Sequence, residues 1–249
     1  MKKQLIALIA VLVPMTTMAA GGAGVPHSME PDLQNQASLQ NGMKLYVNYC
    51  MGCHSLEYQR FSRAAEDLDI PRDIIEDNVI FSSEMAFNDQ METSMSEEDG
   101  ETWFGAPPPD LTLSARLHGT DWLYSYLLSF YQDPSRPTGV NNAVFELVAM
   151  PNVLEPLQGV QEKVCPEADA SEGTSGSETG CNTLEITRQG ELSPEEFEEA
   201  VYDLTNFLAY VGEPSKLQAQ ALAPKVLIFL FIFAVIAYLL KREYWRDIH

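Results

Sequence analysis

The stretch NYCMGCHSL, residues 48–56, places two cysteines three positions apart with a histidine directly behind them. This pattern occurs in zinc knuckles, in dithiol redox pairs and at haem attachment sites. The three kinds of site belong to different proteins. The sequence context of Cys50, Cys53 and His54 decides which of the three kinds of site is present.

Zinc binding and dithiol exchange are both disfavoured. A zinc knuckle needs four ligands, usually from two closely spaced pairs, whereas Cys165 and Cys181 lie far from the motif and do not form such a pair. A thioredoxin-like dithiol follows a strand in a βαβ context. Here residues 38–50, SLQNGMKLYVNYC, carry apolar side chains at helical spacing, which predicts a helix before the motif.

Covalent haem attachment fits the motif and its context. In a helical turn, positions three apart bring two thiols to one face, where they reach two vinyl groups of one porphyrin, and the next residue directs an imidazole at the iron. We therefore expect Cys50 and Cys53 to anchor a haem and His54 to be its first axial ligand.

The second axial ligand is sought among the other histidines and methionines. His27 lies close to the mature N-terminus and His249 beyond the apolar C-terminal run, which leaves His118. A polar, acidic stretch holds three methionines, Met85, Met91 and Met95. Met150 follows an apolar run and precedes a proline, so a loop can present its thioether. Met150 is the preferred candidate, His118 is the rival, and a core-filling methionine is the alternative interpretation. Ligands on both sides of the iron leave no site for oxygen or substrate, which indicates a carrier of single electrons.

Both ends of the chain carry apolar segments. Residues 1–20 have Lys2 and Lys3, a short apolar run and small residues before a cleavage site, which predicts a signal peptide rather than a retained anchor. Residues 222–241 predict a transmembrane helix rather than a buried core helix, because no polar face is visible. The basic residues from Lys241 onward favour a cytoplasmic tail, 242–249, and place residues 21–221 outside the cytoplasm.

The exported body of residues 21–221 is expected to be one mainly α-helical domain with long loop insertions. Further helices are predicted from Thr120 to the Asp133-Pro134 pair and from the cap at Ser193 to the stop at Gly212, and residues 105–111, GAPPPDL, predict an extended segment. By composition, residues 82–101 and 166–180 are irregular.

Charge and the remaining cysteines add two expectations. The chain has 15 Lys and Arg against 36 Asp and Glu, a net charge of −21, and losing Lys2 and Lys3 with the signal gives −21 − 2 = −23. Such a charge repels nucleic acid and attracts basic partners.

Cys165 and Cys181 flank the 166–180 insertion, so a disulfide is expected in an oxidising compartment, with two free thiols as the alternative.

Several segments together resemble the cytochrome c1 family in its bacterial form. They follow one another as YCMGCHSL, APPPDL, HGTDWLYSYLLSFY, RPTGVNN, AMPN, DLTNFLAYVGEP and a single C-terminal span. CMGCH alone marks any c-type cytochrome, whereas this order of segments is much more specific. The resemblance covers nearly the whole mature chain.

The resemblance implies a cytochrome c-type haem domain with one haem c, bound covalently by Cys50 and Cys53 and axially by His54 and Met150. It implies that the segment with Ala106, Pro108 and Pro109 packs on the haem edge. It also implies that an arginine near the start of the aromatic helix meets a haem propionate. Arg116 is the nearest arginine, and His118 stands where the family often has a second one.

The resemblance further implies an electron-transfer subunit of the quinol:cytochrome c oxidoreductase, the bc1 complex, in the bacterial inner membrane with the haem domain in the periplasm. Its partners would be cytochrome b, a Rieske iron–sulfur protein as donor and a soluble or tethered cytochrome c as acceptor. The sequence shows no constellation of catalytic acid, base or nucleophile. The alternatives are a membrane-tethered c-type carrier or oxidase haem subunit that works without cytochrome b, and a thiol or zinc module.

Overall fold

The computed structural model describes residues 25–164 and 183–246. The predicted signal peptide, the predicted disulfide between Cys165 and Cys181 and the 166–180 insertion therefore lie outside the described residues, and they stay predictions.

The described residues are mainly helical and include three small antiparallel sheets of two strands each. The helices are α2 (Gln36–Tyr49), α3 (Phe61–Asp67), α4 (Arg72–Asn78), α5 (Glu97–Phe104), α6 (Ser114–His118), α7 (Thr120–Leu128), α8 (Glu155–Gln158), α9 (Pro194–Gly212) and α10 (Lys216–Tyr244). The strands pair as β1 (Leu56–Arg60) with β2 (Gln90–Met91), β3 (Phe130–Gln132) with β4 (Val140–Asn142), and β5 (Gly159–Val164) with β6 (Thr183–Gln189). The expected mainly α fold is confirmed.

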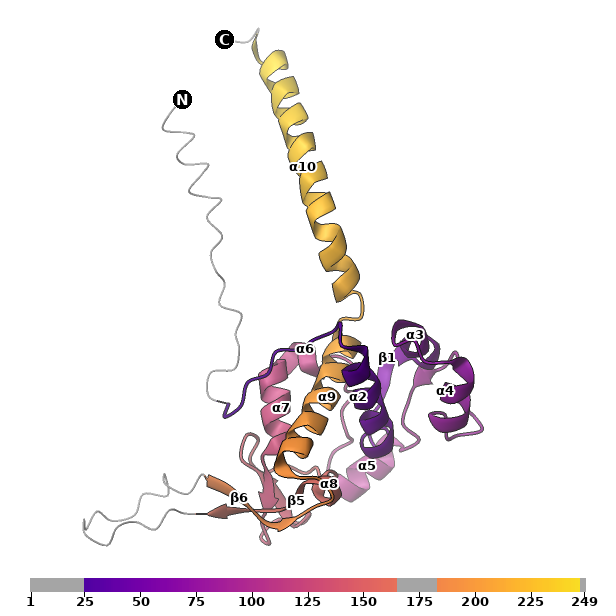
Figure 1. Ribbon diagram of the computed structural model, residues 1–249, viewed down its shortest axis with the longest axis vertical. Coiled ribbons are helices and arrows are strands. Elements are labelled where there is room, and N and C mark those ends of the chain that lie inside the picture. Colours follow the sequence, from indigo (N-terminus) through magenta and orange to yellow (C-terminus); the bar gives the residue numbers. More distant parts are fainter. Residues whose placement is uncertain (1–24, 165–182, 247–249) are drawn as a thin grey trace, which may run out of the picture.

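The core forms where α2 lies along α9, although these helices stand at opposite ends of the body in sequence (Figure 1). Asn35 caps α2 by accepting a hydrogen bond from the Ser38 amide at 3.2 Å. The apolar stripe of α2 is buried against α9, and the rings of Tyr46 and Phe207 lie 5.9 Å apart. At Gly42 the two backbones approach closely, since a Cβ there would lie 2.0 Å from the carbonyl oxygen of Asp203.

Helix α9 has the predicted cap, face and end. The Ser193 hydroxyl accepts a hydrogen bond from the Glu196 amide, and the Glu196 carboxylate accepts one from the Ser193 amide. This reciprocal capping satisfies two amides that a helix start otherwise leaves unpaired. The predicted apolar face is buried throughout, at Phe197, Val201, Leu204, Leu208 and Val211.

Two predicted segments differ from the structure. The aromatic helix ends at Leu128 rather than at Asp133, because residues 130–132 pair with 140–142 as a hairpin in which Phe130 is buried. The 82–101 stretch is not irregular throughout. It contains β2, and the Ser96 hydroxyl caps α5 by accepting a hydrogen bond from the Asp99 amide, beside three acidic residues in the first turn.

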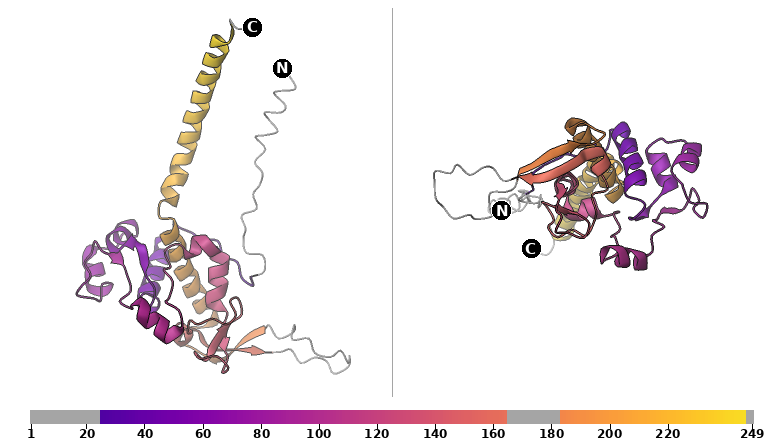
Figure 2. Two further views of the ribbon diagram at one scale, coloured as in Figure 1. Left: turned by 180° about the vertical axis from the view of Figure 1, so that it is seen from behind. Right: turned by 90° about the horizontal axis from the view of Figure 1, so that it is seen from below.

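Helix α10 extends away from the body as a single rod, and both side views agree on this (Figures 1 and 2). It has 29 residues and is long and apolar enough to cross a membrane, and none of its residues is buried in the chain itself. Its exposed apolar surface fits a single-pass membrane anchor. The boundaries predicted for the span and the tail, 222–241 and 242–249, stay predictions.

Candidate haem-binding site

An apolar cavity of about 350 Å³ lies beside the CMGCH motif. Its walls come from the end of α2, the proline segment after α5, helices α6 and α7, the loop between β4 and α8, and α9. The lining side chains are predominantly aliphatic, aromatic and proline, as expected of a pocket for a flat apolar cofactor. The wall includes seven of the eight predicted haem-site residues: Cys50, Cys53, His54, Ala106, Pro108, Pro109 and Met150.

The motif forms a turn that continues from α2. The amide of Cys50 donates to the carbonyl of Tyr46 at 2.8 Å, and the amides of Cys53 and His54 both donate to the carbonyl of Cys50, at 3.0 and 2.9 Å. This turn brings both thiols and the imidazole to the same cavity wall, as the spacing predicts. Among the described cysteines neither thiol is in a disulfide, so both are available for thioether bonds.

His54 is oriented as a metal ligand. Its Nδ1 lies 2.7 Å from the carbonyl oxygen of Pro109. A carbonyl can only accept, so Nδ1 carries the proton and Nε2 keeps the lone pair that binds a metal. Burial lowers the pKa of His54, opposed by this hydrogen bond and by the nearby Asp110, so the ring is held neutral. The Tyr46 hydroxyl fixes the main chain by donating to the His54 carbonyl at 2.6 Å.

The thiols do not have the chemistry of a redox dithiol. Burial, with a smaller contribution from the charge of Cys53, raises the pKa of Cys50 to about 12, and burial also raises the pKa of Cys53. Dithiol exchange needs a thiolate with a lowered pKa. The described residues also contain no cluster of three His, Cys, Asp or Glu side chains placed to hold a metal ion. The raised thiol pKa values thus disfavour dithiol exchange at the motif.

Met150 reaches the cavity from the loop before α8, about a hundred residues after the motif. Its side chain is half-buried, and the Tyr126 hydroxyl donates a hydrogen bond to its sulfur at 3.3 Å. Of the methionines that the structure describes, Met150 is the one on the cavity wall. Met91 is instead fully buried in β2 opposite Leu56. The donor set of two thiols, a neutral imidazole and a thioether fits a haem c.

Arg116 and His118, the two residues considered near the haem propionate, differ in whether they line the cavity. Arg116 is exposed and is not on the cavity wall, and its Cβ lies near Gly212, 3.7 Å from where a Cβ on that glycine would stand. His118 does line the cavity, with its ring stacked on Trp122 at 4.4 Å. Trp122 stacks in turn on Tyr126 at 5.1 Å, which completes an aromatic stack at positions four apart.

The sequence reasoning missed the site roles of Trp122 and Tyr126, of Phe104 and Phe145 on the cavity wall, and of Tyr46 behind His54. The spacing of four residues between His118, Trp122 and Tyr126 is a signal that predicts a shared face. The partners of that face come from other segments and depend on the tertiary fold.

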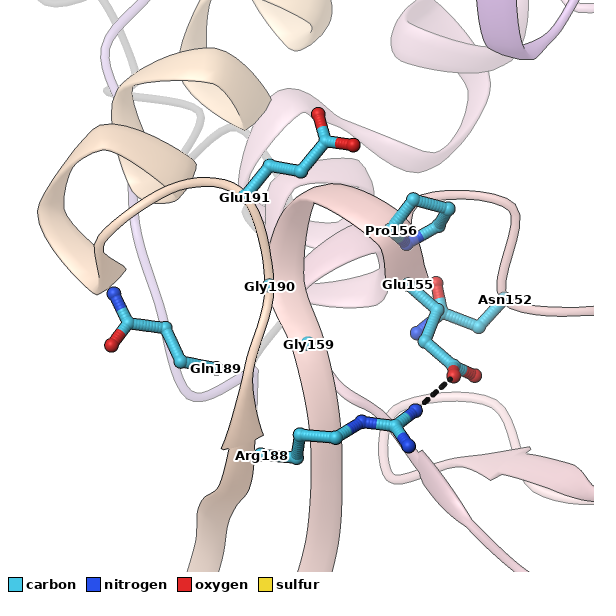
Figure 3. Close-up of a pocket in the computed structure, with 8 residues that line it drawn as sticks. All are labelled: Asn152, Glu155, Pro156, Gly159, Arg188, Gln189, Gly190 and Glu191. Atoms are coloured by element: carbon cyan, nitrogen blue, oxygen red, sulfur yellow. Dashed lines mark hydrogen bonds and ion pairs between the residues drawn. The ribbon is translucent and has the colours of Figure 1, made fainter.

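A second, larger hollow of about 550 Å³ lies between α8 and the β5–β6 hairpin (Figure 3). It is polar and open, and the Arg188 guanidinium crosses it to the Glu155 carboxylate at 3.4 Å. Its base forms where Gly159 and Gly190 allow two backbone segments to approach closely. It contains neither a thiol nor an imidazole, so it has none of the ligands of a haem site.

Comparisons with known proteins show the family of the chain. A sequence model of the Cytochrome C1 family matches residues 29–164 and 189–248. The chain is 43% identical to cytochrome c1 of Allochromatium vinosum over the full length of both proteins. It is 40% identical to a Nitrosomonas europaea protein named ammonia monooxygenase gamma subunit, over 97% of each chain. It is also 26% identical to cytochrome b/c1 of Bradyrhizobium diazoefficiens, with 86% of this chain matching 34% of that longer protein. On its fold, its haem-type cavity and these matches, the chain belongs to the cytochrome c1 family.

Proposed function

We propose that Cys50 and Cys53 form the two thioether bonds to the haem, that His54 and Met150 are its axial ligands, and that the chain passes electrons from a Rieske iron–sulfur protein to a cytochrome c. The observation that carries this proposal is that Cys50, Cys53, His54 and Met150 line the same apolar cavity, although Met150 follows the motif by about a hundred residues. As a cytochrome c1 the chain carries one covalently bound haem c and is the electron-transfer subunit of a bc1 complex.

The haem supplies a one-electron iron couple, and the protein residues set its ligation and surroundings. The Pro109 carbonyl holds the proton of His54 on Nδ1 and leaves the lone pair of Nε2 free to bind a metal. The Tyr126 hydroxyl orients the Met150 thioether, and Pro151 keeps the preceding backbone out of a helix. With His54 and Met150 both bound to it, the iron would have no open position for oxygen or substrate, and the Met150 thioether would favour the reduced state relative to a second imidazole.

We assign the donor and acceptor from the family and from charge. The Bradyrhizobium relative is named cytochrome b/c1, a name that joins both cytochromes in one protein and supports cytochrome b as the neighbour in the complex. The strongly acidic composition supports a basic cytochrome c as acceptor, since opposite charge raises encounter rates. A carrier that works without cytochrome b is not favoured.

For the membrane we propose that α10 crosses it once, with the haem domain on the periplasmic side. Lys241, Arg242 and Arg246 follow the apolar run and favour the cytoplasm. A chain that stops after Pro214 should be recovered in the soluble fraction. Protease added to spheroplasts should degrade the haem domain of the full chain, and a protected domain would contradict this orientation.

Isolation of the tagged full chain in mild detergent tests the function. We expect a pyridine haemochrome spectrum with one haem c per chain, and co-isolation of a cytochrome b and a Rieske protein. A matched preparation of the Cys50→Ala, Cys53→Ala double variant should lack the covalent haem. Haem c without cytochrome b would instead identify a tethered carrier, and a wild-type chain without covalent haem would exclude a cytochrome.

A further inference from the structure

The loop that brings Met150 to the cavity contains a residue in an unfavourable backbone conformation. This loop, residues 143–154, joins the end of β4 to the start of α8. Within it Leu147 has a φ of 60°, in the left-handed region that residues other than glycine adopt only at a cost in free energy. The Leu147 side chain is 69% exposed, so its burial does not offset this cost. Other groups must hold the backbone here.

Both backbone polar groups of Leu147 are held by side chains of the β3–β4 hairpin. The Leu147 amide donates to the side-chain carbonyl of Asn141 at 2.9 Å. The Leu147 carbonyl accepts from the Arg136 guanidinium at 3.0 Å, and the same guanidinium nitrogen lies 3.5 Å from the carbonyl oxygen of Val148. Arg136 and Asn141 thus fix the backbone on both sides of Leu147, three residues before Met150.

The hairpin that holds Leu147 is itself tied to helix α7. Asn142, next to Asn141 in β4, is fully buried, and its Nδ2 donates to the Tyr126 carbonyl at 2.7 Å. Its Oδ1 accepts from the amides of Val144 and Phe145, at 2.9 and 3.1 Å. The start of the loop is therefore fixed to the helix whose Tyr126 hydroxyl contacts the Met150 sulfur.

The other end of the loop is fixed to α7 as well. The Asn152 side chain donates to the Gln158 side chain at 3.0 Å, and buried Gln158 donates to the Leu128 carbonyl at 3.3 Å. Of the side chains that the structure shows bonded to the loop, Arg136 is the charged one. Hydrogen bonds from a charged donor are stronger than those from a neutral donor.

We propose that Arg136 is a positioning residue for the haem: with Asn141 it holds Leu147 in the left-handed conformation and so keeps the Met150 thioether on the cavity wall. The inference rests on the proposed ligation by Met150. Arg136 is not on the cavity wall, so it acts through the loop. Without its hydrogen bonds Leu147 relaxes to a negative φ, which turns the chain before Met150 and moves the thioether out of place. The iron then loses part of its preference for the reduced state.

Redox titration and carbon monoxide binding of the detergent-solubilised, haem-loaded full chain test this inference. Arg136→Met removes the donors and keeps a long side chain. It should retain the covalent haem, have a lower potential than wild type and bind carbon monoxide, which the wild type should exclude. Each tenfold loss of preference for reduced iron corresponds to a fall of 59 mV. Arg136→Lys keeps the charge and a donor and should retain most of the wild-type potential.

A pair of substitutions at Leu147 tests the role of the backbone conformation. In the Arg136→Met chain, a second change Leu147→Gly should raise the potential back toward wild type, because glycine adopts a positive φ at little cost. Leu147→Ala removes the same side chain but keeps the backbone preference, so it should not restore the potential. Arg72→Met is the matched control, since Arg72 pairs with Glu76 on the surface of α4 at 2.7 Å. It should keep the wild-type potential.

Two results would overturn the inference: an Arg136→Met holoprotein that keeps the wild-type potential and excludes carbon monoxide, or a Leu147→Gly change that restores no more than Leu147→Ala. If Arg136→Met yields no holoprotein, Arg136→Gln, with its shorter side chain, is held to the same criteria. Met150→Leu separates this inference from the proposed function. An unchanged potential in Met150→Leu would overturn ligation by Met150 and this inference with it, whereas a fall in Met150→Leu without one in Arg136→Met would overturn this inference alone.

Discussion

At the scale of single residues, the fold itself orders His54, the proposed first axial ligand. The Pro109 carbonyl selects one tautomer of His54, and the Tyr46 hydroxyl holds the His54 carbonyl. A hydrogen bond to the ring nitrogen that does not bind the metal orients the ligand and raises its basicity. The free energy of ordering His54 is thus provided by folding and need not be provided by the haem.

The two thiols should each contribute one covalent bond. In Cys50→Ala or Cys53→Ala we expect the haem to be held by a single thioether, and in the double variant we expect none. Haem staining of a denaturing gel measures this directly. His54→Ala should keep the thioethers but lose a stable low-spin spectrum. Staining of the double variant at wild-type strength would refute the assignment.

Met150 should set the potential. In Met150→Leu the covalent haem should remain, while the potential should fall because the thioether that favours reduced iron is lost. Each 59 mV of that fall is a tenfold change in the equilibrium for one electron. Met91→Leu is the matched control, since Met91 is buried in the core and not on the cavity wall. If Met150→Leu leaves the spectrum and potential unchanged while His118→Ala alters both, His118 is the ligand.

The residues of the motif could be predicted from the sequence, because the thiols and the imidazole of such a site are close neighbours along the chain. Cys50, Cys53 and His54 lie within five positions, so one helical turn is enough to bring them together. Sequence reasoning also selected Met150, which the structure places on the cavity wall. The contact of Tyr126 with Met150 and the stack of His118 on Trp122 depend on how α6, α7 and the loop before α8 pack. No local pattern encodes that packing.

At the scale of elements, the crossing of α2 and α9 depends on Gly42. A Cβ at this position would lie 2.0 Å from the Asp203 carbonyl oxygen and 2.6 Å from the Phe207 Cβ. Gly42→Ala should therefore destabilise the protein by about 1–3 kcal/mol or more, even though alanine gains about 1 kcal/mol of helix propensity. The midpoint of thermal unfolding should fall by several degrees.

Gly52 provides the control for this prediction. It lies within the motif, it is exposed, and a Cβ there meets nothing within 4 Å. Gly52→Ala should leave the unfolding midpoint and the haem content near wild type. Equal loss of stability in the Gly42 and Gly52 variants would contradict the close approach of the two helices.

The cap of α9 should give a pH-dependent contribution to stability. Hydrogen bonds from the Ser193 amide and hydroxyl lower the pKa of Glu196 in the folded protein. Its stabilisation is therefore present above the ordinary glutamate pKa of about 4.3 and is lost as pH falls through the lower folded value. Ser193→Ala should cost about 1 kcal/mol at neutral pH.

Denaturant unfolding at several pH values measures this contribution. The stability difference between wild type and Glu196→Gln should shrink on acidification, whereas exposed Glu199→Gln should show no such difference. A difference that grows at low pH would contradict the capping box.

A helix with a capping residue and a regular apolar face, such as α9, was predicted well from the sequence. Short strands that pair with each other, such as β3 and β4, were not. Helix α9 has Ser193, Glu196 and a regular apolar face in its sequence. Strand β3 was assigned to the preceding helix, because the aromatic residues of 120–131 suit a buried helix as well as a strand, and only the pairing with β4 decides between them. The start of α5 was missed although Ser96 and the acidic residues after it form a cap signal.

At the scale of the whole molecule, the chain combines an acidic haem domain with one exposed apolar helix. The body carries the cavity, and α10 projects from it with no buried residue (Figure 1). Such a helix needs a lipid or protein environment for its apolar surface. The anchor was evident from the sequence because an uncharged run of spanning length is a local signal. No local sequence pattern identifies the neighbouring subunits of the complex, so these were inferred from the family resemblance.

We propose that this chain receives electrons from quinol oxidation through a haem held by Cys50, Cys53, His54 and Met150. The most direct measurement adds quinol to the complex isolated in mild detergent and follows the absorbance of its haem c. We predict that the haem c of the wild-type complex is reduced within one turnover, and that in the Met150→Leu complex, with covalent haem and cytochrome b still present, its reduction stalls. A wild-type haem c that stays oxidised while cytochrome b is reduced would contradict the account.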